Sequence, residues 1–189
     1  MSSLVVFAST NALYLTESET VKLVPAKEEK TDTLQIKFKQ FARDHWTDQE
    51  RENVAIVIDF VQHLMNNHDF EYVKEKFGDH PYTQHNRAMN DGMSGVIEFV
   101  SDFAERFPEY TYDVKHIYVD GDFVIFHSHS TIKQKHRANP NKGLNIIDTW
   151  RVKDGQIVEH WDSIQAVDGS MRLFGLMSGG KIKNANTLY

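Results

Sequence analysis

Two histidines stand two residues apart in the stretch FVIFHSHST, at His127 and His129. Side chains alternate between the faces of a β-strand, so both imidazoles are expected on one face together with Phe123 and Ile125. These apolar neighbours indicate the inward face, where the imidazoles could donate hydrogen bonds to a bound molecule or stabilise a charged oxygen. The alternative is a pair of partly exposed histidines on an edge strand.

Asp148 is the second chemical candidate, in the stretch LNIIDTWRV, where it shares one strand face with Ile146, Trp150 and Val152. A carboxylate among such side chains is either buried at a cost or lines a pocket, and desolvation makes it a stronger base. In one cavity with the histidine pair, it could abstract a proton next to a carbonyl while an imidazole stabilises the enolate. The alternative is a structural Asp bonded to the neighbouring backbone or to Arg151.

The following strand contains the run EHWD and begins after an Asp-Gly dipeptide at 154–155, which is typical of two-residue hairpin turns. With a plain two-residue turn, Asp148 lies opposite Trp161, and alternation points Trp161 toward the face of Asp148. His160 and Asp162 then point away from that face. A β-bulge near His160 would instead turn Asp162 inward, and the sequence leaves both registers open.

The stretch YTQHN places Tyr82, Gln84 and His85 on a short extended piece, which is either part of a pocket wall or a polar loop. The predicted substrate contacts combine this piece with the last hairpin. The predicted substrate-binding residues are Tyr82, His85, Trp150, Trp161, Asp162 and Gln165.

A metal site is a separate hypothesis. His127, His129, His85 and a carboxylate could supply the nitrogen and oxygen ligands that Zn²⁺ or Fe²⁺ accept. Because two histidines at this spacing are a weak signal, the sequence favours a site without a metal and without a cofactor.

These residues are carried by elements whose periodicity changes along the chain. Thr47 and Glu50 form a capping box, after which apolar residues recur at helical spacing to about Asn67. Two further helices are predicted, one ending at Gly78 and one near residues 94–106. Four strands follow, at residues 110–119, 122–133, 144–153 and 156–167. Helices followed by an antiparallel meander predict an α+β domain with its helices on one side of the sheet.

The domain is predicted at residues 47–170. Residues 1–46 have no steady period and are predicted to be an extension outside the main fold, in which LVVFA and TLQIKFKQF could each form a short strand. The alternative is that this extension adds an edge strand or contacts a second subunit. Residues 171–189 also lack periodicity and are predicted to be a loose tail or a partner contact.

The composition of the 189 residues excludes several classes of function. The chain has no cysteine, which excludes disulfides, thiol catalysis and Cys-ligated metals. Its net charge of −6 gives no reason to bind nucleic acid. No apolar run approaches the roughly 20 residues that a bilayer-spanning helix needs, so we expect no membrane segment and a cytoplasmic protein.

The stretches YTQHN…DGMSGVIEFV, GDFVIFHSHS and IIDTWRVKDGQIVEHWDSIQ together resemble the SnoaL-like polyketide cyclase family of the nuclear transport factor 2-like superfamily. The resemblance covers residues 48–167, is most specific in the final hairpin, and is strongest to the SnoaL-like aldol-condensation subgroup. It implies a cone-shaped barrel, in which a strongly curved antiparallel sheet wraps three N-terminal helices around a pocket. It also implies a homodimer through the sheets and a reaction without metal or cofactor.

In the cyclases that the chain resembles, an Asp on the strand before the final hairpin removes a proton from a polyketide methylene, and an intramolecular aldol reaction closes a ring. Asp148 stands at that position and His129 matches a strand histidine of the same pocket, while His127 is our own addition beside it. The resemblance thus implies an enzyme acting on a small hydrophobic carbonyl compound. Because the superfamily also contains isomerases, dehydratases and non-catalytic domains, a ligand-binding or dimerisation module is the alternative.

Overall fold

The computed structural model describes residues 33–178 and 183–186, which belong to a compact unit that spans Asp32–Tyr189. The strand predicted at LVVFA lies outside the described residues. The described part begins with an extended segment and a single helical turn, α1 (Phe38–Phe41), where the sequence predicted a second short strand.

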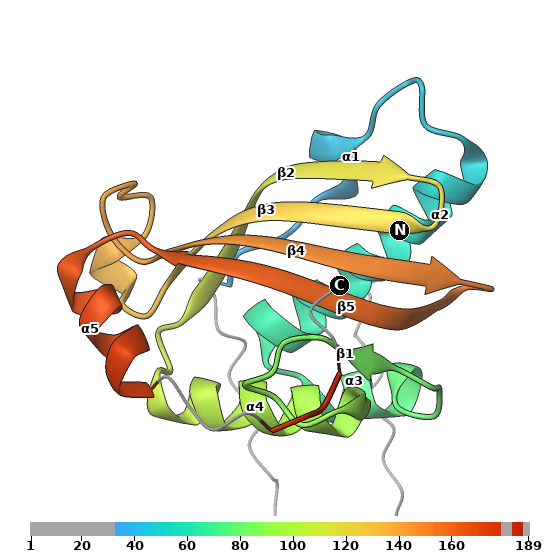
Figure 1. Ribbon diagram of the computed structural model, residues 1–189. Coiled ribbons are helices and arrows are strands. Elements are labelled where there is room, and N and C mark those ends of the chain that lie inside the picture. Colours follow the sequence, from blue (N-terminus) through green and yellow to red (C-terminus); the bar gives the residue numbers. More distant parts are fainter. Residues whose placement is uncertain (1–32, 179–182, 187–189) are drawn as a thin grey trace, which may run out of the picture. The chain divides into compact units, whose positions relative to one another are not determined.

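Five strands form one sheet in the order β1-β5-β4-β3-β2 (Figure 1). The strands are β1 (Thr83–Gln84), β2 (Thr111–Asp120), β3 (Phe123–Thr131), β4 (Leu144–Lys153) and β5 (Gln156–Ala166). The four long strands are antiparallel neighbours, whereas β1 pairs with β5 in parallel. The predicted α+β class is confirmed, but the curved sheet is not closed into a barrel, and β1 and β2 are its edge strands among the described residues.

Three helices precede the long strands and cover one face of the sheet (Figure 1). They are α2 (Asp48–Val61), α3 (Phe70–Phe77) and α4 (Gly92–Arg106). The predicted capping box at the start of α2 is confirmed. The Thr47 hydroxyl accepts a hydrogen bond from the Glu50 amide, and the Glu50 carboxylate accepts one from the Thr47 amide.

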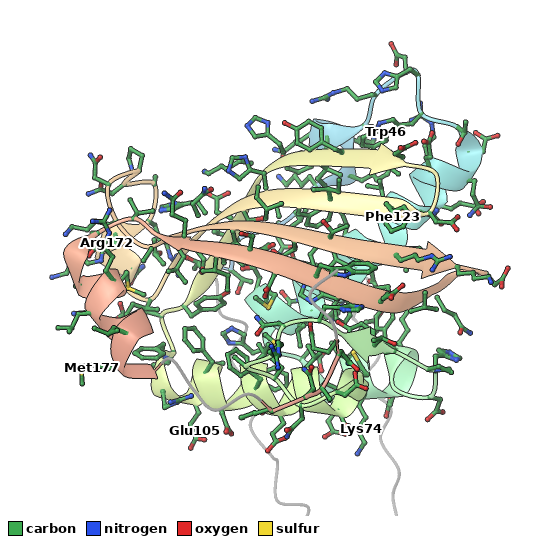
Figure 2. The ribbon with its side chains drawn as sticks, viewed as in Figure 1. Trp46, Lys74, Glu105, Phe123, Arg172 and Met177 are labelled. Atoms are coloured by element: carbon green, nitrogen blue, oxygen red, sulfur yellow. The ribbon has the colours of Figure 1, made fainter. Side chains whose placement is uncertain are left out.

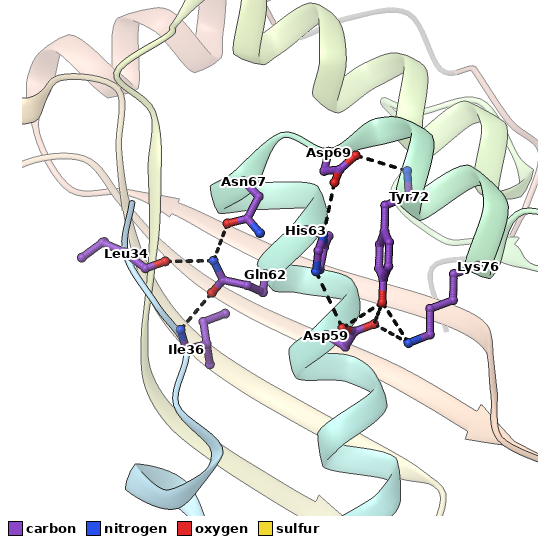
Figure 3. A network of polar contacts seen from close by, with 9 residues as sticks. All are labelled: Leu34, Ile36, Asp59, Gln62, His63, Asn67, Asp69, Tyr72 and Lys76. Carbon is purple, nitrogen blue, oxygen red and sulfur yellow. Dashed lines mark hydrogen bonds and ion pairs between the residues drawn. The ribbon is translucent and has the colours of Figure 1, made fainter. Parts of the chain in front are cut away.

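Beyond α2 the chain continues as a π-helix, Gln62–Asn67, whose first side chain organises the segment before α1. Gln62 accepts a hydrogen bond from the Ile36 amide at 2.9 Å and donates to the Leu34 carbonyl at 3.0 Å (Figure 3). It also donates to the side-chain oxygen of Asn67 at 2.8 Å. The strand predicted here is therefore wrong, because one glutamine side chain satisfies the backbone groups that a neighbouring strand would pair.

The described part of the predicted extension packs onto the domain. Phe41 and Trp46 are buried in the hydrophobic core, and the rings of Phe38 and Trp46 meet edge to face with centroids 6.4 Å apart. Residues 33–46 are thus continuous with the core that the helices and the sheet enclose.

The chain after β5 forms α5 (Gly169–Ser178), where the sequence predicted irregular structure from residue 171. Asp168 begins this helix by accepting hydrogen bonds from the amides of Ser170 and Met171. Met171 is buried, whereas Met177 lies on the solvent side of the helix (Figure 2). None of the helices in the described part of the chain combines the length and the apolar character that crossing a bilayer requires.

Replacing Gln62 by Leu should lower the free energy of unfolding by about 1–3 kcal/mol. The reason is that Leu leaves the Leu34 carbonyl and the Ile36 amide without their partner in a partly buried place. Urea denaturation of the full chain measures the change. The matched control is Gln40→Leu at an exposed position of α1, and equal losses in the two variants would contradict this prediction.

Candidate active site

A cavity of about 500 Å³ lies between the inward face of the sheet and the helices α2, α4 and α5. This volume lies in the range of sites that bind small molecules. Most of the wall is apolar, with contributions from Phe60, Val100 and Phe103 of the helices and Trp150 of β4. The polar residues in the wall are Tyr82, Gln84, Asn86, Tyr110, Tyr112, Asp148, His160 and Asp162.

Asp148 lies on β4 with its side chain in this cavity and an exposed fraction of 6%. Ile146, Trp150 and Val152 are buried with it, so the predicted face of this strand is confirmed. One carboxylate oxygen accepts a hydrogen bond from the Tyr112 hydroxyl, and the other lies 3.1 Å from Nε2 of His160. The carboxylate is therefore buried, but both of its oxygens have polar partners.

The side chains of β5 reach the cavity because this strand contains one extra residue. The hairpin turn is the predicted two-residue turn, since Lys153 pairs with Gln156. The register then shifts between Arg151 and Val152, so that β5 skips Val158. After this bulge Asp148 lies opposite Asp162 and Trp150 lies opposite His160. Of the two registers that the sequence left open, the bulged one is present, and it turns both His160 and Asp162 inward.

The hydrogen bonds of His160 identify which of its ring nitrogens carries a hydrogen. Oε1 of Gln84 accepts the backbone N–H of Asn86 at 2.8 Å, which identifies this atom as the carbonyl oxygen of the amide. Nδ1 of His160 lies 3.0 Å from the same oxygen and must therefore donate a hydrogen. Nε2 then faces the Asp148 oxygen at 3.1 Å, and this contact requires one proton between the two atoms. The pair is an imidazolium beside a carboxylate, or a neutral imidazole beside a carboxylic acid.

Asp162 is the second carboxyl group of the cavity, and it accepts a hydrogen bond from the side-chain amide of Asn86. Burial raises the pKa of Asp162 above its ordinary value, and the nearby charge of Asp148 raises it further. His160 and the hydrogen bond from Asn86 oppose this rise in pKa. The net effect is a raised pKa, so Asp162 keeps its proton to a higher pH than a free aspartate does.

Tyr82 and Tyr112 are two of the three tyrosines in the polar part of the wall. Burial, and next the charge of Asp148, raise the pKa values of Tyr82 and Tyr112 well above the ordinary tyrosine value. Both hydroxyls therefore stay protonated and can donate hydrogen bonds. Tyr112 already donates to Asp148, and Tyr82 accepts from the side-chain amide of Gln84 at 3.4 Å.

His127 and His129 lie on the opposite face of the sheet, so the prediction that they share a pocket with Asp148 is wrong. Neither lines the cavity. Nε2 of His127 lies 2.6 Å from the side-chain oxygen of Asn145, and Nε2 of His129 lies 2.6 Å from the carbonyl oxygen of Lys142. Both imidazoles thus have partners on the outer surface.

The error has a physical reason. Both faces of β3 carry large apolar residues, so alternation separates the two faces without saying which one is inward. The buried face holds Val124, Phe126 and Ser128, whereas Phe123 at the start of the strand is 40% exposed (Figure 2). An inward assignment based on Phe123 therefore reversed the strand.

Three predicted substrate contacts also lie outside the cavity wall. Trp161 points outward and stacks on the imidazole of His85, with ring centroids 4.6 Å apart and planes 7° from parallel. His85 contacts the Glu159 carboxylate at 3.1 Å. Gln165 is exposed and accepts a hydrogen bond from Asn145. The other three, Tyr82, Trp150 and Asp162, lie in the cavity wall.

The residues that the sequence reasoning missed are those that hold the acid groups. Gln84 and Asn86 contact His160 and Asp162, and Tyr112 contacts Asp148. A usable signal was present, because Gln84 and Asn86 have the same two-residue spacing as His160 and Asp162. Recognising it required the parallel pairing of β1 with β5.

The same cluster has a composition that suits a metal ion. Asp148, His160 and Asp162 each offer one ligand atom, and these atoms lie within 4.8 Å of one another. The metal hypothesis based on His127, His129 and His85 is not supported, because these three residues do not form such a group in the described part of the chain.

Comparison with protein families gives one match. The sequence model of the SnoaL-like domain matches residues 57–160, which is more than half of the chain. This span includes the β2–β3 hairpin, β4 and the first part of β5, and it ends at His160, before Asp162. No curated protein matches the chain with significance.

Several solved structures are similar in fold. A candidate polyketide cyclase from Bacillus cereus is 20% identical, with a TM-score of 0.51 over 61% of this chain and 75% of that one. A candidate SnoaL-like polyketide cyclase from Jannaschia sp. is 17% identical, with a TM-score of 0.52 over 74% of this chain and 100% of that one. AclR, a candidate hydroxylase from Streptomyces galilaeus, is 19% identical, with a TM-score of 0.50 over 69% and 97%. At these identities the likeness shows the fold alone.

The raised pKa of Asp162 should appear in the pH dependence of stability. Between the ordinary and the raised pKa, the folded protein keeps a proton that the unfolded chain has released, so stability falls as the pH rises through this window. Asp162→Asn abolishes that contribution. Relative to wild type, the variant should therefore gain free energy of unfolding in urea titrations as the pH rises above the ordinary pKa of an aspartate. A parallel pH dependence of the two proteins would count against a raised pKa, and Asp120→Asn at an exposed strand end is the control.

Proposed function

The chain belongs to the SnoaL-like domain family, and on that premise we propose that it is an enzyme that removes a proton next to the carbonyl of a small, mainly apolar substrate. Asp148 is the base. The reaction that follows is an aldol-type cyclisation, isomerisation or condensation, carried out without a cofactor.

The observation that carries this proposal is the pairing of Asp148 with His160 inside an apolar cavity. In the imidazolium–carboxylate state, an oxygen of Asp148 accepts the substrate proton while the adjacent cation stabilises the negative charge that develops. Electrostatic stabilisation of this kind is strongest where water is excluded. The near-complete burial of Asp148 and His160 meets that condition.

The proton balance of the proposed step is simple. The C–H bond next to the carbonyl breaks, its proton moves to a carboxylate oxygen of Asp148, and its electron pair passes to the carbonyl oxygen as an enolate. The enolate carbon then attacks a second carbonyl carbon. The alkoxide formed in this attack takes the proton back from Asp148, so the site returns to its starting state.

The remaining polar groups suit the role of donors to the substrate oxygen. Tyr82 stays protonated, and the raised pKa of Asp162 favours its acid form. Buried neutral donors of this kind stabilise an enolate oxygen as it gains charge. They take the place that the sequence assigned to His127 and His129.

The charges of the wall point to an uncharged substrate. Two carboxyl groups face the cavity, and none of the described residues in its wall is Lys or Arg. An anionic substrate would lose its hydration without gaining a counter-ion. We therefore favour neutral 1,3-dicarbonyl compounds, whose acidic methylene is also the easiest proton for a carboxylate to remove.

Asp148→Asn should slow proton removal by a factor of about 10²–10⁴, the usual contribution of a general base. The measurement is exchange of the methylene protons of neutral 1,3-dicarbonyl compounds in D₂O, followed by ¹H NMR with wild type and variant. Exchange catalysed equally by both proteins would remove Asp148 from the mechanism.

The matched comparison for this experiment uses two histidines that lie on opposite faces of the sheet. His160→Gln should lose most of the exchange activity, and His127→Gln on the outer face should keep it. If no compound exchanges but the cavity binds one of them unchanged, and binding survives Asp148→Asn, the chain is a ligand-binding module instead.

A metal-dependent reaction is the second candidate, favoured by the way the three ligand atoms are held. Gln84 binds Nδ1 of His160, Tyr112 binds one oxygen of Asp148, and Asn86 binds one oxygen of Asp162. Each side chain thus keeps another ligand atom for an ion. Hydrogen bonds of this kind commonly orient metal ligands.

Elemental analysis of the purified full chain decides between the two candidates. The proton-transfer proposal predicts less than about one tenth of an equivalent of Zn, Fe or Mn, and exchange activity that survives a chelator. One equivalent of a divalent metal that is lost in Asp162→Asn would instead establish the metal site.

A further inference from the structure

The last described residues of the chain bind the loop that follows β1. The Lys183 amide donates to the Arg87 carbonyl at 2.8 Å. The side-chain amide of Asn184 donates to the carbonyls of Asn86 at 3.0 Å and Met89 at 2.9 Å. Three carbonyls of one short loop are thus satisfied by a segment that lies about 95 residues further along the chain.

Asn186 makes an equivalent contact with the last residue of β1. Its side-chain amide donates to the Gln84 carbonyl at 2.9 Å. Asn184 and Asn186 are both half-buried, whereas Lys183 and Ala185 between and beside them are exposed. The segment therefore presents alternate side chains to the loop, as a strand would.

Three pairs of residues with the same spacing thus lie side by side: Asn184 and Asn186, Gln84 and Asn86, and His160 and Asp162. Asn186 binds Gln84, whose side chain binds His160. Asn184 binds Asn86, whose side chain binds Asp162. Both series of contacts end at a polar residue of the cavity wall, one at His160 and the other at Asp162.

We propose that Asn184 and Asn186 are positioning residues for the active site, which act through the backbone of Gln84 and Asn86. The inference rests on the proposed function in taking Asp148 and His160 as the reacting pair. It goes beyond that function because residues 183–186 lie outside the span that matches the family.

The physical need for this support lies in β1. A strand of two residues makes few ladder bonds, and β1 lies at the edge of the sheet with no further strand beside it among the described residues. The carbonyls of Gln84 and Asn86 point away from β5 toward Asn186 and Asn184. Asp91 holds the Gln84 amide at 2.8 Å, and the two asparagines add the contacts to the carbonyls that fix the loop, and with it the imidazole of His160, firmly enough for catalysis.

The test replaces each asparagine by an isosteric residue that cannot donate. Asn186→Asp and Asn184→Asp keep the shape but put a carboxylate oxygen against a backbone carbonyl. The control is Asn141→Asp, which adds the same charge in an exposed loop. All three variants are made in the full chain.

Two readouts report on the site without any substrate. The first is hydrogen exchange of the Asn86 amide, which donates to Gln84 and should exchange about tenfold faster in either site variant. The second is the side-chain ¹⁵N spectrum of His160, assigned with His160→Gln. Wild type should show a protonated Nδ1, and Asn186→Asp should show a mixture of protonation states.

Unchanged exchange and an unchanged His160 spectrum in both site variants would overturn the proposal. Asn186→Ala and Asn184→Ala provide the same comparison if the charged variants do not fold. An altered His160 spectrum with an unchanged urea midpoint identifies positioning rather than general stabilisation. Neither readout uses turnover. The positioning role of the two asparagines can therefore be confirmed or refuted even if the proposed reaction is wrong.

Discussion

The hydrogen bond between Gln84 and His160 sets the chemistry of the cavity, because it decides which imidazole nitrogen faces Asp148. Because Nδ1 donates its hydrogen to Gln84, the proton in the contact to Asp148 is a second one, and either the imidazole or the carboxyl group must carry it. The pairing of β1 with β5 places the two residues side by side, and this explains why a two-residue strand matters. The sheet, the helices and the loop after β1 all serve to keep this one contact in place.

Burying two carboxyl groups in an apolar cavity is costly unless each finds partners. The fold meets this cost with neutral groups and one histidine: Tyr112 and His160 contact Asp148, and Asn86 contacts Asp162. Each carboxyl group of the cavity therefore has at least one polar partner that compensates for its lost hydration.

The sequence predicts those features that depend on neighbours along the chain. The capping box at Thr47 and the turn at Asp154 need only local residues, and the turn residue adopts a left-handed φ of 51°. The face of Asp148 also follows from its own strand. The orientation of β3 does not, because both of its faces are apolar. The role of Gln84 depends on the non-local pairing of β1 with β5, because its partner lies 76 residues away in the sequence.

The skipped residue in β5 has an evolutionary consequence. What matters is that Val158 is left out of the ladder, because pairing it would shift the register of every residue that follows it in the strand. A continuous ladder through Val158 would exchange the inward His160 and Asp162 for their outward neighbours without altering any residue. Relatives on this fold can therefore differ in chemistry through the register of one strand alone, so an aligned histidine indicates a shared site only where the strand pairing is shared as well.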